Sequence, residues 1–183
     1  MTAIAHKYWS DQELLSFPKD GCKREIIDGE LVMSPASSFH GAIIMRIAGP
    51  LFMFVSSARL GELLDGQTGC RLSDGDLLSP DISFVTAARW KAHRQTSEVF
   101  FGGGPDFLVE VLSPDDTIGR IEGKLEKCFR ERTRLAWIVH PRTRRVHVYR
   151  TGGVDLVLKE GQALSGDELF PGFTLNIAAI FPE

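Results

Sequence analysis

The sequence predicts an α/β fold in which a mixed central β-sheet is flanked by helices. Three observations support this fold class. The turn-forming pair Asp28-Gly29 separates two strand-like runs, which indicates an antiparallel hairpin. A long apolar helix follows at about 38–59. Residues 105–139 then read as strand, helix and strand, the order that connects parallel strands. Hairpins together with one such crossover give a mixed sheet with helices packed against it.

The N-terminal third is predicted to contain two helices around the hairpin. Ser10-Asp-Gln-Glu13 has the spacing of a capping box and predicts the start of a short helix. The hairpin spans Arg24 to Met33. Ser37 or Ser38 then caps the long helix, and Gly49-Pro50 inside it is expected to kink or split it. Because this helix is apolar on most sides, we expect it in the interior or at a subunit interface.

The middle of the chain is predicted to be rich in strands. Leu60 to Val85 is expected to form two or three strands, separated by turns at Asp65-Gly66 and Asp74-Gly75. Residues 86–104 are polar and are expected to be partly helical. The triple glycine at 102–104 precedes a strand instead of opening a helix, so it does not indicate a phosphate-binding loop.

The C-terminal third begins with a turn at 113–116 that offers N-cap residues. A helix at about 117–132 is predicted from apolar residues on one face: Ile118, Ile121, Leu125, Cys128 and Phe129. Residues 135–139 form a buried strand and 144–149 a half-exposed one, because the latter alternates apolar and polar residues. Residues 154–158 are expected to add an edge strand, and 175–181 a short terminal helix.

Length and composition predict one ordinary globular domain over residues 1–183. The three cysteines are odd in number and far apart, which excludes a disulfide framework or a paired-cysteine zinc site. The first ten residues have no apolar core typical of a signal peptide. No run reaches roughly 18 uninterrupted apolar residues, so no membrane span is predicted. We therefore expect a cytoplasmic protein.

Charge is unevenly distributed along the chain, although the net charge is only −3. Residues 120–150 contain ten Lys and Arg against three acids, a local charge of +7, and the remainder carries −10. Such segregation is expected of a protein that binds phosphate groups. The alternative is that these are ordinary solvated charges on a helix and a hairpin.

Two carboxylates in strand-like runs point to a hard-cation site. Glu110 lies within the apolar run 105–112, where a carboxylate is costly unless a cation receives it. Asp81 stands at the start of a second run, 79–85. If the two converge, they supply the oxygen ligands that Mg²⁺ prefers, and Mg²⁺ or Mn²⁺ promotes phosphodiester hydrolysis. Leu112, two residues after Glu110, occupies the position where an E-x-K nuclease carries lysine.

Lys124 can replace that missing lysine. It lies 14 residues after Glu110, on the flank of the apolar face of the predicted helix, so its stem can follow the core toward the strand ends. The alternative is an ordinary surface lysine. Arg120 and Lys127 are predicted to point further outward, where they suit contacts with the phosphates of a nucleic acid.

Glu25 and His40 are the next candidates. Glu25 lies in the first hairpin strand and could hold a metal or a water molecule, and His40 could contact phosphate or relay a proton. An exposed strand acid and a capping or surface histidine are the plain alternatives. The remaining histidines show no zinc-ligand spacing with cysteine or with one another. No nucleophile lies on a recognisable elbow, which argues against a cysteine or serine hydrolase.

These motifs resemble the Uma-type restriction endonuclease family of the PD-(D/E)-x-K nuclease superfamily. The resemblance covers about residues 23–181. It rests on Glu25-Ile-Ile-Asp-Gly-Glu-Leu-Val, His40, Pro80-Asp81, the run 105–114 around Glu110, Lys124, and Trp137-Ile-Val-x-Pro141. The chain departs from the family pattern where Cys128 replaces tyrosine, Arg132-Thr133 replaces a loop glycine, and His140 replaces the aspartate before proline.

The resemblance implies a restriction-endonuclease-like fold with the superfamily lysine moved to the helix, at Lys124. It also implies a magnesium-type site at Asp81 and Glu110, with Glu25 and His40 nearby, DNA as substrate, and a homodimer. We therefore expect a Mg²⁺- or Mn²⁺-dependent DNA endonuclease. The alternative is a non-catalytic nucleic-acid-binding or dimeric interaction protein that retains the fold. The sequence does not decide the recognition sequence, DNA against RNA, or nicking against double-strand cleavage.

Overall fold

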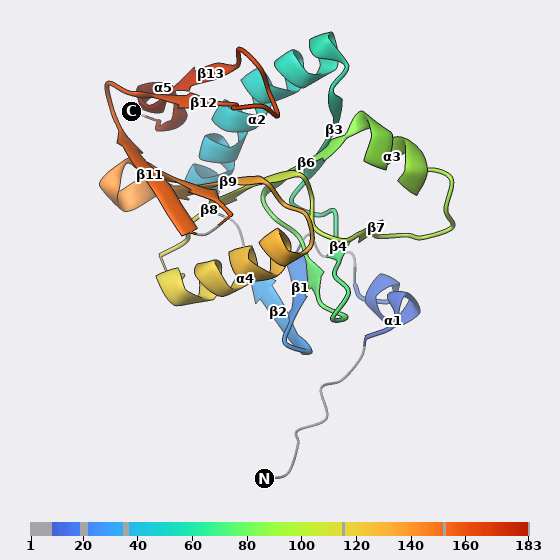
Figure 1. Cartoon of the computed structure of the whole chain (residues 1–183). Coiled ribbons are helices and arrows are strands. Elements are labelled where there is room, and N and C mark those ends of the chain that lie inside the picture. Colours follow the sequence, from blue (N-terminus) through green and yellow to red (C-terminus); the bar gives the residue numbers. More distant parts are fainter. Residues whose placement is uncertain (1–8, 19–21, 35–36, 115, 152, 183) are drawn as a thin grey trace.

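The computed structural model describes residues 9–18, 22–34, 37–114, 116–151 and 153–182, and all statements below concern this part of the chain (Figure 1). Its helices are α1 (Asp11–Leu15), α2 (Ser38–Ala58), α3 (Ala87–His93), α4 (Ile118–Arg130), the 3₁₀ turn η1 (Pro141–Thr143) and α5 (Ile177–Ile180). Its strands are β1 (Lys23–Ile27), β2 (Glu30–Ser34), β3 (Gly61–Asp65), β4 (Cys70–Arg71), β5 (Leu77–Leu78), β6 (Ile82–Thr86), β7 (Phe101–Gly102), β8 (Phe107–Val111), β9 (Leu135–His140), β10 (Arg145–Arg150), β11 (Gly153–Lys159), β12 (Ala163–Ser165) and β13 (Thr174–Asn176).

The strands form one large mixed sheet and two smaller sheets. The large sheet has the order β11-β10-β9-β8-β6-β3, and only its β8–β9 pair is parallel. A second sheet, β2-β1-β5-β4-β7, contains the N-terminal hairpin, and β12 pairs with β13. The predicted fold class, mixed sheets flanked by helices, is therefore confirmed. The sequence did not predict the second sheet as a separate unit. Its strands β4, β5 and β7 have only two residues each, which is too short for a periodic pattern.

Helices α2 and α4 cover opposite faces of the large sheet, with α4 directly above the β1–β2 hairpin in Figure 1. The alternation along β8 sets this arrangement. Phe107, Val109 and Val111 pack into the core on the α2 side, whereas Leu108 packs with Ile121 and Leu125 of α4. Glu110 shares the face of Leu108, and it is therefore directed at α4.

Helix α2 is continuous through Pro50, so the predicted split does not occur. Pro50 lies on the exposed side, and Ile47 and Leu51 on either side of it are both held in the core. By length and composition α2 could cross a bilayer, a property that it shares with core helices of soluble proteins. One face is buried as expected, and the other exposes Met45, Phe52 and Met53.

Most predicted elements lie where the sequence placed them, with local corrections. Asp28 and Gly29 both have positive φ, at 53° and 78°, as a two-residue hairpin turn requires. The capping box at Ser10, the helix after Thr117 and the edge strand β11 are also confirmed. The region 60–85 contains four strands instead of two or three. The predicted terminal helix begins only at Ile177, because Leu175 pairs with Leu164 in the β12–β13 hairpin.

Candidate active site

Asp81 and Glu110 lie side by side at one end of the large sheet. Strands β6 and β8 are antiparallel with Ile82 opposite Val109, so Asp81, directly before β6, lies next to Glu110. Asp81 is fixed there because its Oδ2 accepts the backbone N–H of Val111 at 2.8 Å. Both carboxylates are almost fully buried, each with 5% exposure. The predicted convergence of the two strand acids is therefore present in the fold.

A lysine that the sequence did not single out lies between these two carboxylates. The Lys23 ammonium, from the first residue of β1, is 2.9 Å from Asp81 Oδ1 and 3.6 Å from Glu110 Oε2. Its side chain is only 15% exposed. One cation is thus shared by the two acids that were predicted to bind metal.

Lys124 reaches the opposite side of Glu110 from helix α4. Its ammonium contacts Glu110 Oε1 at 2.5 Å, and it lies 2.9 Å and 3.1 Å from the two carboxylate oxygens of Glu25. Glu25 is positioned by β1, and its Oε1 also accepts the backbone N–H of Ser79 at 2.8 Å. Lys124 is only 6% exposed. Of the two alternatives that the sequence left open, it is therefore the lysine directed into the core and not an ordinary surface lysine.

His40 joins the cluster from the first turn of α2. Ser37 caps this helix by accepting the backbone N–H of His40, which brings the imidazole over the end of β6. Its Nε2 is 3.2 Å from Asp81 Oδ2. Its Nδ1 is buried and has no hydrogen-bond partner among the described residues. A buried polar atom without a partner is costly, so this nitrogen is available to a bound group.

The pKa values of the three carboxyl groups are shifted in different directions by their surroundings. Burial would raise the pKa of Asp81, but His40 and Lys23 outweigh it and hold the pKa well below its ordinary value. For Glu25, burial is likewise outweighed, chiefly by Lys124, and the pKa is lowered. Burial dominates at Glu110, whose pKa is raised although Lys124 and Lys23 oppose the shift. Glu110 is therefore the carboxylate with the greatest need for a further cation.

Burial alone would lower the pKa of Lys124, but the carboxylates of Glu110 and Glu25 outweigh it and raise the pKa. The same balance, with Glu110 and Asp81 as the partners, raises the pKa of Lys23. Both lysines are consequently ammonium ions at neutral pH. Two ammonium groups thus lie among three carboxyl groups in one buried cluster.

Asp81 and Glu110 fit a divalent cation of the magnesium type. This fit is supported by the position of the Lys23 ammonium, which pairs with both carboxylates. A positive charge can therefore be shared by the two acids, as a bound metal ion would be. Within the described residues, no three His, Cys, Asp or Glu side chains are arranged to hold a metal. Magnesium commonly binds through one or two carboxylates and several waters, so two carboxylates suffice.

The cluster is open to solvent through a cavity of about 730 Å³. All six side chains discussed above line it: Lys23, Glu25, His40, Asp81, Glu110 and Lys124. Its opposite wall is largely apolar and is formed by α2, including Ala48 and Phe52. Arg120 lines the cavity from α4 and is exposed. A charged group of a ligand can therefore reach the buried carboxylates.

The match of a family model decides to which family the chain belongs. The model of the Uma2 family, described as "Putative restriction endonuclease", matches residues 11–178. The chain belongs to the Uma2 family. Its fold resembles that of a crystal structure described as a putative nuclease belonging to DUF820 from Anabaena variabilis, with a TM-score of 0.80 and 22% sequence identity. The likeness covers 93% of this chain and 96% of the other chain. No curated protein matches the sequence.

In this Uma2 protein, the five predicted catalytic residues come together in one cavity: Glu25, His40, Asp81, Glu110 and Lys124. The two residues that were predicted to contact nucleic acid, Arg120 and Lys127, lie in different places. Arg120 lies at the cavity, but Lys127 lies outside it and pairs with Asp28, Asp74 and Asp76. Its charge is neutralised by carboxylates, which does not favour a contact with phosphate.

The basic segment of residues 120–150 is less basic in space than in sequence. Six of its ten cations pair with carboxylates: Lys124, Lys127, Arg130, Arg134, Arg144 and Arg150. Most of these acids come from other parts of the chain, such as Asp106, Asp155 and Glu160. Counting charge along the sequence could not detect this compensation, because it depends on tertiary pairing.

Sequence reasoning missed two residues of this Uma2 protein that shape the site. Lys23 was overlooked because it precedes the hairpin and has no recognisable spacing to either acid. Asp76 is 3% exposed, accepts the N–H groups of Asp28 and Gly29, and contacts the Lys127 ammonium. It thereby joins the hairpin that carries Glu25 to the helix that carries Lys124. The only signal in the sequence was the Asp74-Gly75 turn just before it.

Proposed function

We propose that this protein is a Mg²⁺- or Mn²⁺-dependent endonuclease that hydrolyses phosphodiester bonds in DNA. The observation that carries the proposal is the buried pair of Asp81 and Glu110 sharing one cation, with Lys124 held against Glu110 from the neighbouring helix. Membership of the Uma2 family supports the same chemistry. Hydrolysis of a phosphodiester needs a cation at the phosphate, an activated water and stabilisation of the developing negative charge.

Each need has a candidate in the cluster. A divalent ion on Asp81 and Glu110 would supply Lewis-acid stabilisation of the phosphate and lower the pKa of a bound water. Lys124 is an ammonium ion fixed by two carboxylates, so it can orient the attacking water or stabilise charge on the pentavalent phosphate. Glu25 accepts a hydrogen bond from the Lys124 ammonium and so holds it in place. Its carboxylate could also accept a hydrogen bond from a water molecule bound next to Lys124.

His40 and Lys23 are placed to act on the phosphate itself. His40 has Nε2 against Asp81, and its Nδ1 has no partner among the described residues, so the imidazole can contact a phosphate oxygen or relay a proton to the leaving oxygen. Lys23 balances Asp81 and Glu110 in the metal-free protein. If a divalent ion held those carboxylates, the Lys23 ammonium would be free to balance the charge of the phosphate.

The test is incubation of purified protein with supercoiled plasmid and Mg²⁺ or Mn²⁺. Wild type is expected to nick or cut the plasmid, and Glu110→Gln and Lys124→Met are expected to be inactive. Glu168→Gln and Lys159→Met are matched controls, because both residues are exposed and lie outside the cavity. Equal cleavage by all five proteins would reveal a contaminant. Binding of DNA without cleavage under either metal would favour the non-catalytic binding protein.

A further inference from the structure

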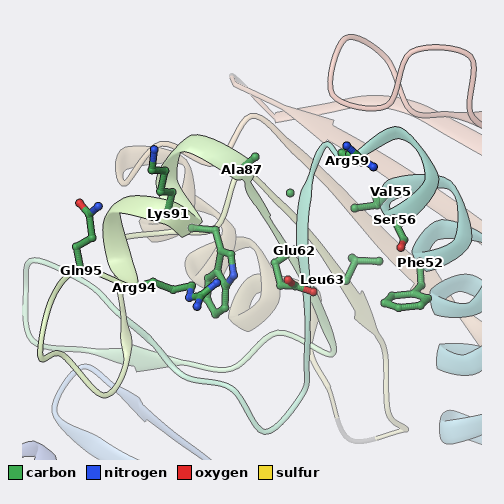
Figure 2. A pocket seen from close by; sticks show the side chains of 12 residues that line it. Phe52, Val55, Ser56, Arg59, Glu62, Leu63, Ala87, Lys91, Arg94 and Gln95 are labelled. Carbon is green, nitrogen blue, oxygen red and sulfur yellow. The ribbon is translucent and has the colours of Figure 1, made fainter.

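A second cavity, of about 580 Å³, lies between the C-terminal part of α2 and helix α3 (Figure 2). Two helices line it with the same spacing. From α2 and its C-cap come Phe52, Val55, Ser56 and Arg59, and from α3 and its C-cap come Ala87, Trp90, Lys91 and Arg94. Each set follows i, i+3, i+4 and i+7, which is one face of a helix. Figure 2 shows Glu62 and Leu63 of β3 between the two helix faces.

The charge of this cavity is positive and is not compensated. Arg59, Lys91 and Arg94 line it against the single acid Glu62. Within the described part of the chain, none of the three cations forms an ion pair or a side-chain hydrogen bond. Most cations of the 120–150 segment are, by contrast, paired. Free cations gathered in a hollow are the part of this surface best suited to bind phosphate groups.

The second cavity adjoins the candidate active site, because Phe52 and Leu63 line both cavities. Phe52 is 51% exposed at this junction, which leaves an aromatic surface on the path between them. An exposed aromatic ring beside free cations is the combination with which proteins hold single-stranded nucleic acids, by base stacking and by backbone contacts.

We propose that the second cavity binds the phosphates of an unpaired nucleic-acid strand next to the cleaved bond. Arg59, Lys91 and Arg94 contact the strand backbone, and Phe52 stacks on a base where the strand passes from the active site. This inference rests on the proposed nuclease function and extends it to a substrate class, a single-stranded or locally unpaired segment. The scissile phosphate has to reach carboxylates that are 5% exposed at the bottom of a cavity, which a flexible strand can do.

The first experiment measures binding of a fluorescein-labelled single-stranded oligodeoxynucleotide by fluorescence anisotropy in EDTA, where no metal-dependent cleavage occurs. The test variant is Arg59→Gln/Arg94→Gln. The control is Arg142→Gln/Arg145→Gln, which removes two exposed arginines whose side chains pair with no described residue and line neither cavity. Each phosphate contact contributes about 0.7 to the salt slope for a single strand, so the test variant should lose roughly 1.4 and the control nothing.

A second pair of variants tests the stacking contact. Phe52→Ala is expected to weaken binding of the single strand about tenfold, the order expected for one stacked base. Met53→Ala is the control, because Met53 is 69% exposed on the same helix and lines neither cavity. Thermal unfolding of every variant is needed, since Arg59 and Arg94 are C-cap residues that also stabilise their helices.

Cleavage assays distinguish failure of this inference from failure of the nuclease proposal. The small diester bis(4-nitrophenyl) phosphate reaches only the carboxylate cluster, so Arg59→Gln/Arg94→Gln should hydrolyse it at the wild-type rate and cleave the oligonucleotide poorly. An unchanged salt slope, absent wild-type binding, or better binding of the matching duplex would overturn the inference even if cleavage is observed. A lowered slope without any hydrolysis would uphold the binding site and overturn the nuclease proposal.

Discussion

The ammonium of Lys23, whose side chain is 15% exposed, lies 2.9 Å from the buried carboxylate of Asp81. This pair defines the site more than any other contact, because Lys23 also reaches Glu110 at 3.6 Å. The lysine occupies the position from which one cation can serve both acids. A divalent ion would have to compete with it for the same oxygens.

Removal of this competitor should strengthen metal binding. We predict that Lys23→Met binds Mn²⁺ more tightly than wild type in calorimetric titration. A charge-assisted hydrogen bond is worth about 1.5–3 kcal/mol, so its loss from the metal-free state corresponds to roughly a ten- to hundredfold lower Kd. Arg120→Met, which removes a cation from the cavity wall but not from the carboxylates, should change Kd little. Weaker Mn²⁺ binding by Lys23→Met would mean that the lysine supports the ion instead of replacing it.

The ionised carboxylate of Glu110 is expected to lower the stability of the folded protein. Because its pKa is raised in the folded protein, the ionised carboxylate is disfavoured by folding, and this cost grows as the pH rises above the ordinary glutamate pKa and is complete above the folded pKa. Glu110→Gln is therefore expected to unfold at the same or a higher temperature than wild type when the pH lies above that value. Glu25 has a lowered pKa, so Glu25→Gln should lower the unfolding temperature under the same conditions. The reverse order of the two variants in a thermal melt would contradict this.

Replacement of Lys127 should lower the free energy of unfolding and leave DNA binding unchanged. Lys127→Met leaves the Asp76 carboxylate buried without its cation, which should cost about 1–3 kcal/mol of unfolding free energy. The salt dependence of oligonucleotide binding should stay unchanged, because this ammonium already pairs with aspartates. A salt slope reduced by about 0.7 would instead restore Lys127 as a phosphate contact. Denaturant unfolding and anisotropy measure the two effects separately.

A pH-dependent loss of stability should come from the histidine pair on β9 and β10. The His140 and His147 rings stack with centroids 3.9 Å apart, and burial together with His147 lowers the pKa of His140 to about 4. The unfolded chain takes up this proton near pH 6.5, so stability is complete above that pH and is lost as pH falls toward 4. His140→Gln should unfold with a weaker pH dependence between those values. Parallel melting curves of variant and wild type would argue against it.

The sequence predicted those parts of the site that follow from local pattern. Strand period placed Glu110 on the same face as Leu108, and helical period placed Lys124 on the flank of an apolar face that packs there. Buried acids in apolar strands are costly, and this physical rule identified Asp81 and Glu110 before any geometry was known. Family resemblance drew Glu25 and His40 into the same site, and the fold brings both to one cavity.

The remaining features depend on contacts between distant segments. Lys23 lies 58 residues from Asp81, and Lys127 lies 51 residues from Asp76. No periodicity connects such pairs, so neither the lysine between Asp81 and Glu110 nor the aspartate that links α4 to the hairpin could be found from the sequence. The same limitation explains why the charge count along the sequence predicted a phosphate-binding surface at residues 120–150. The unpaired cations at the second cavity, Arg59, Lys91 and Arg94, are scattered over two helices.

The most direct test of the account compares metal binding with cleavage in one titration series. Calorimetry gives the Mn²⁺ Kd of the wild type, and the initial rate of oligonucleotide cleavage is measured over the same Mn²⁺ concentrations. The account predicts that the rate follows occupancy of one site and that Glu110→Gln loses both the site and the cleavage. Cleavage that persists in Glu110→Gln, or that proceeds without Mn²⁺ bound to the wild type, would contradict the assignment of Asp81 and Glu110 as the catalytic metal site.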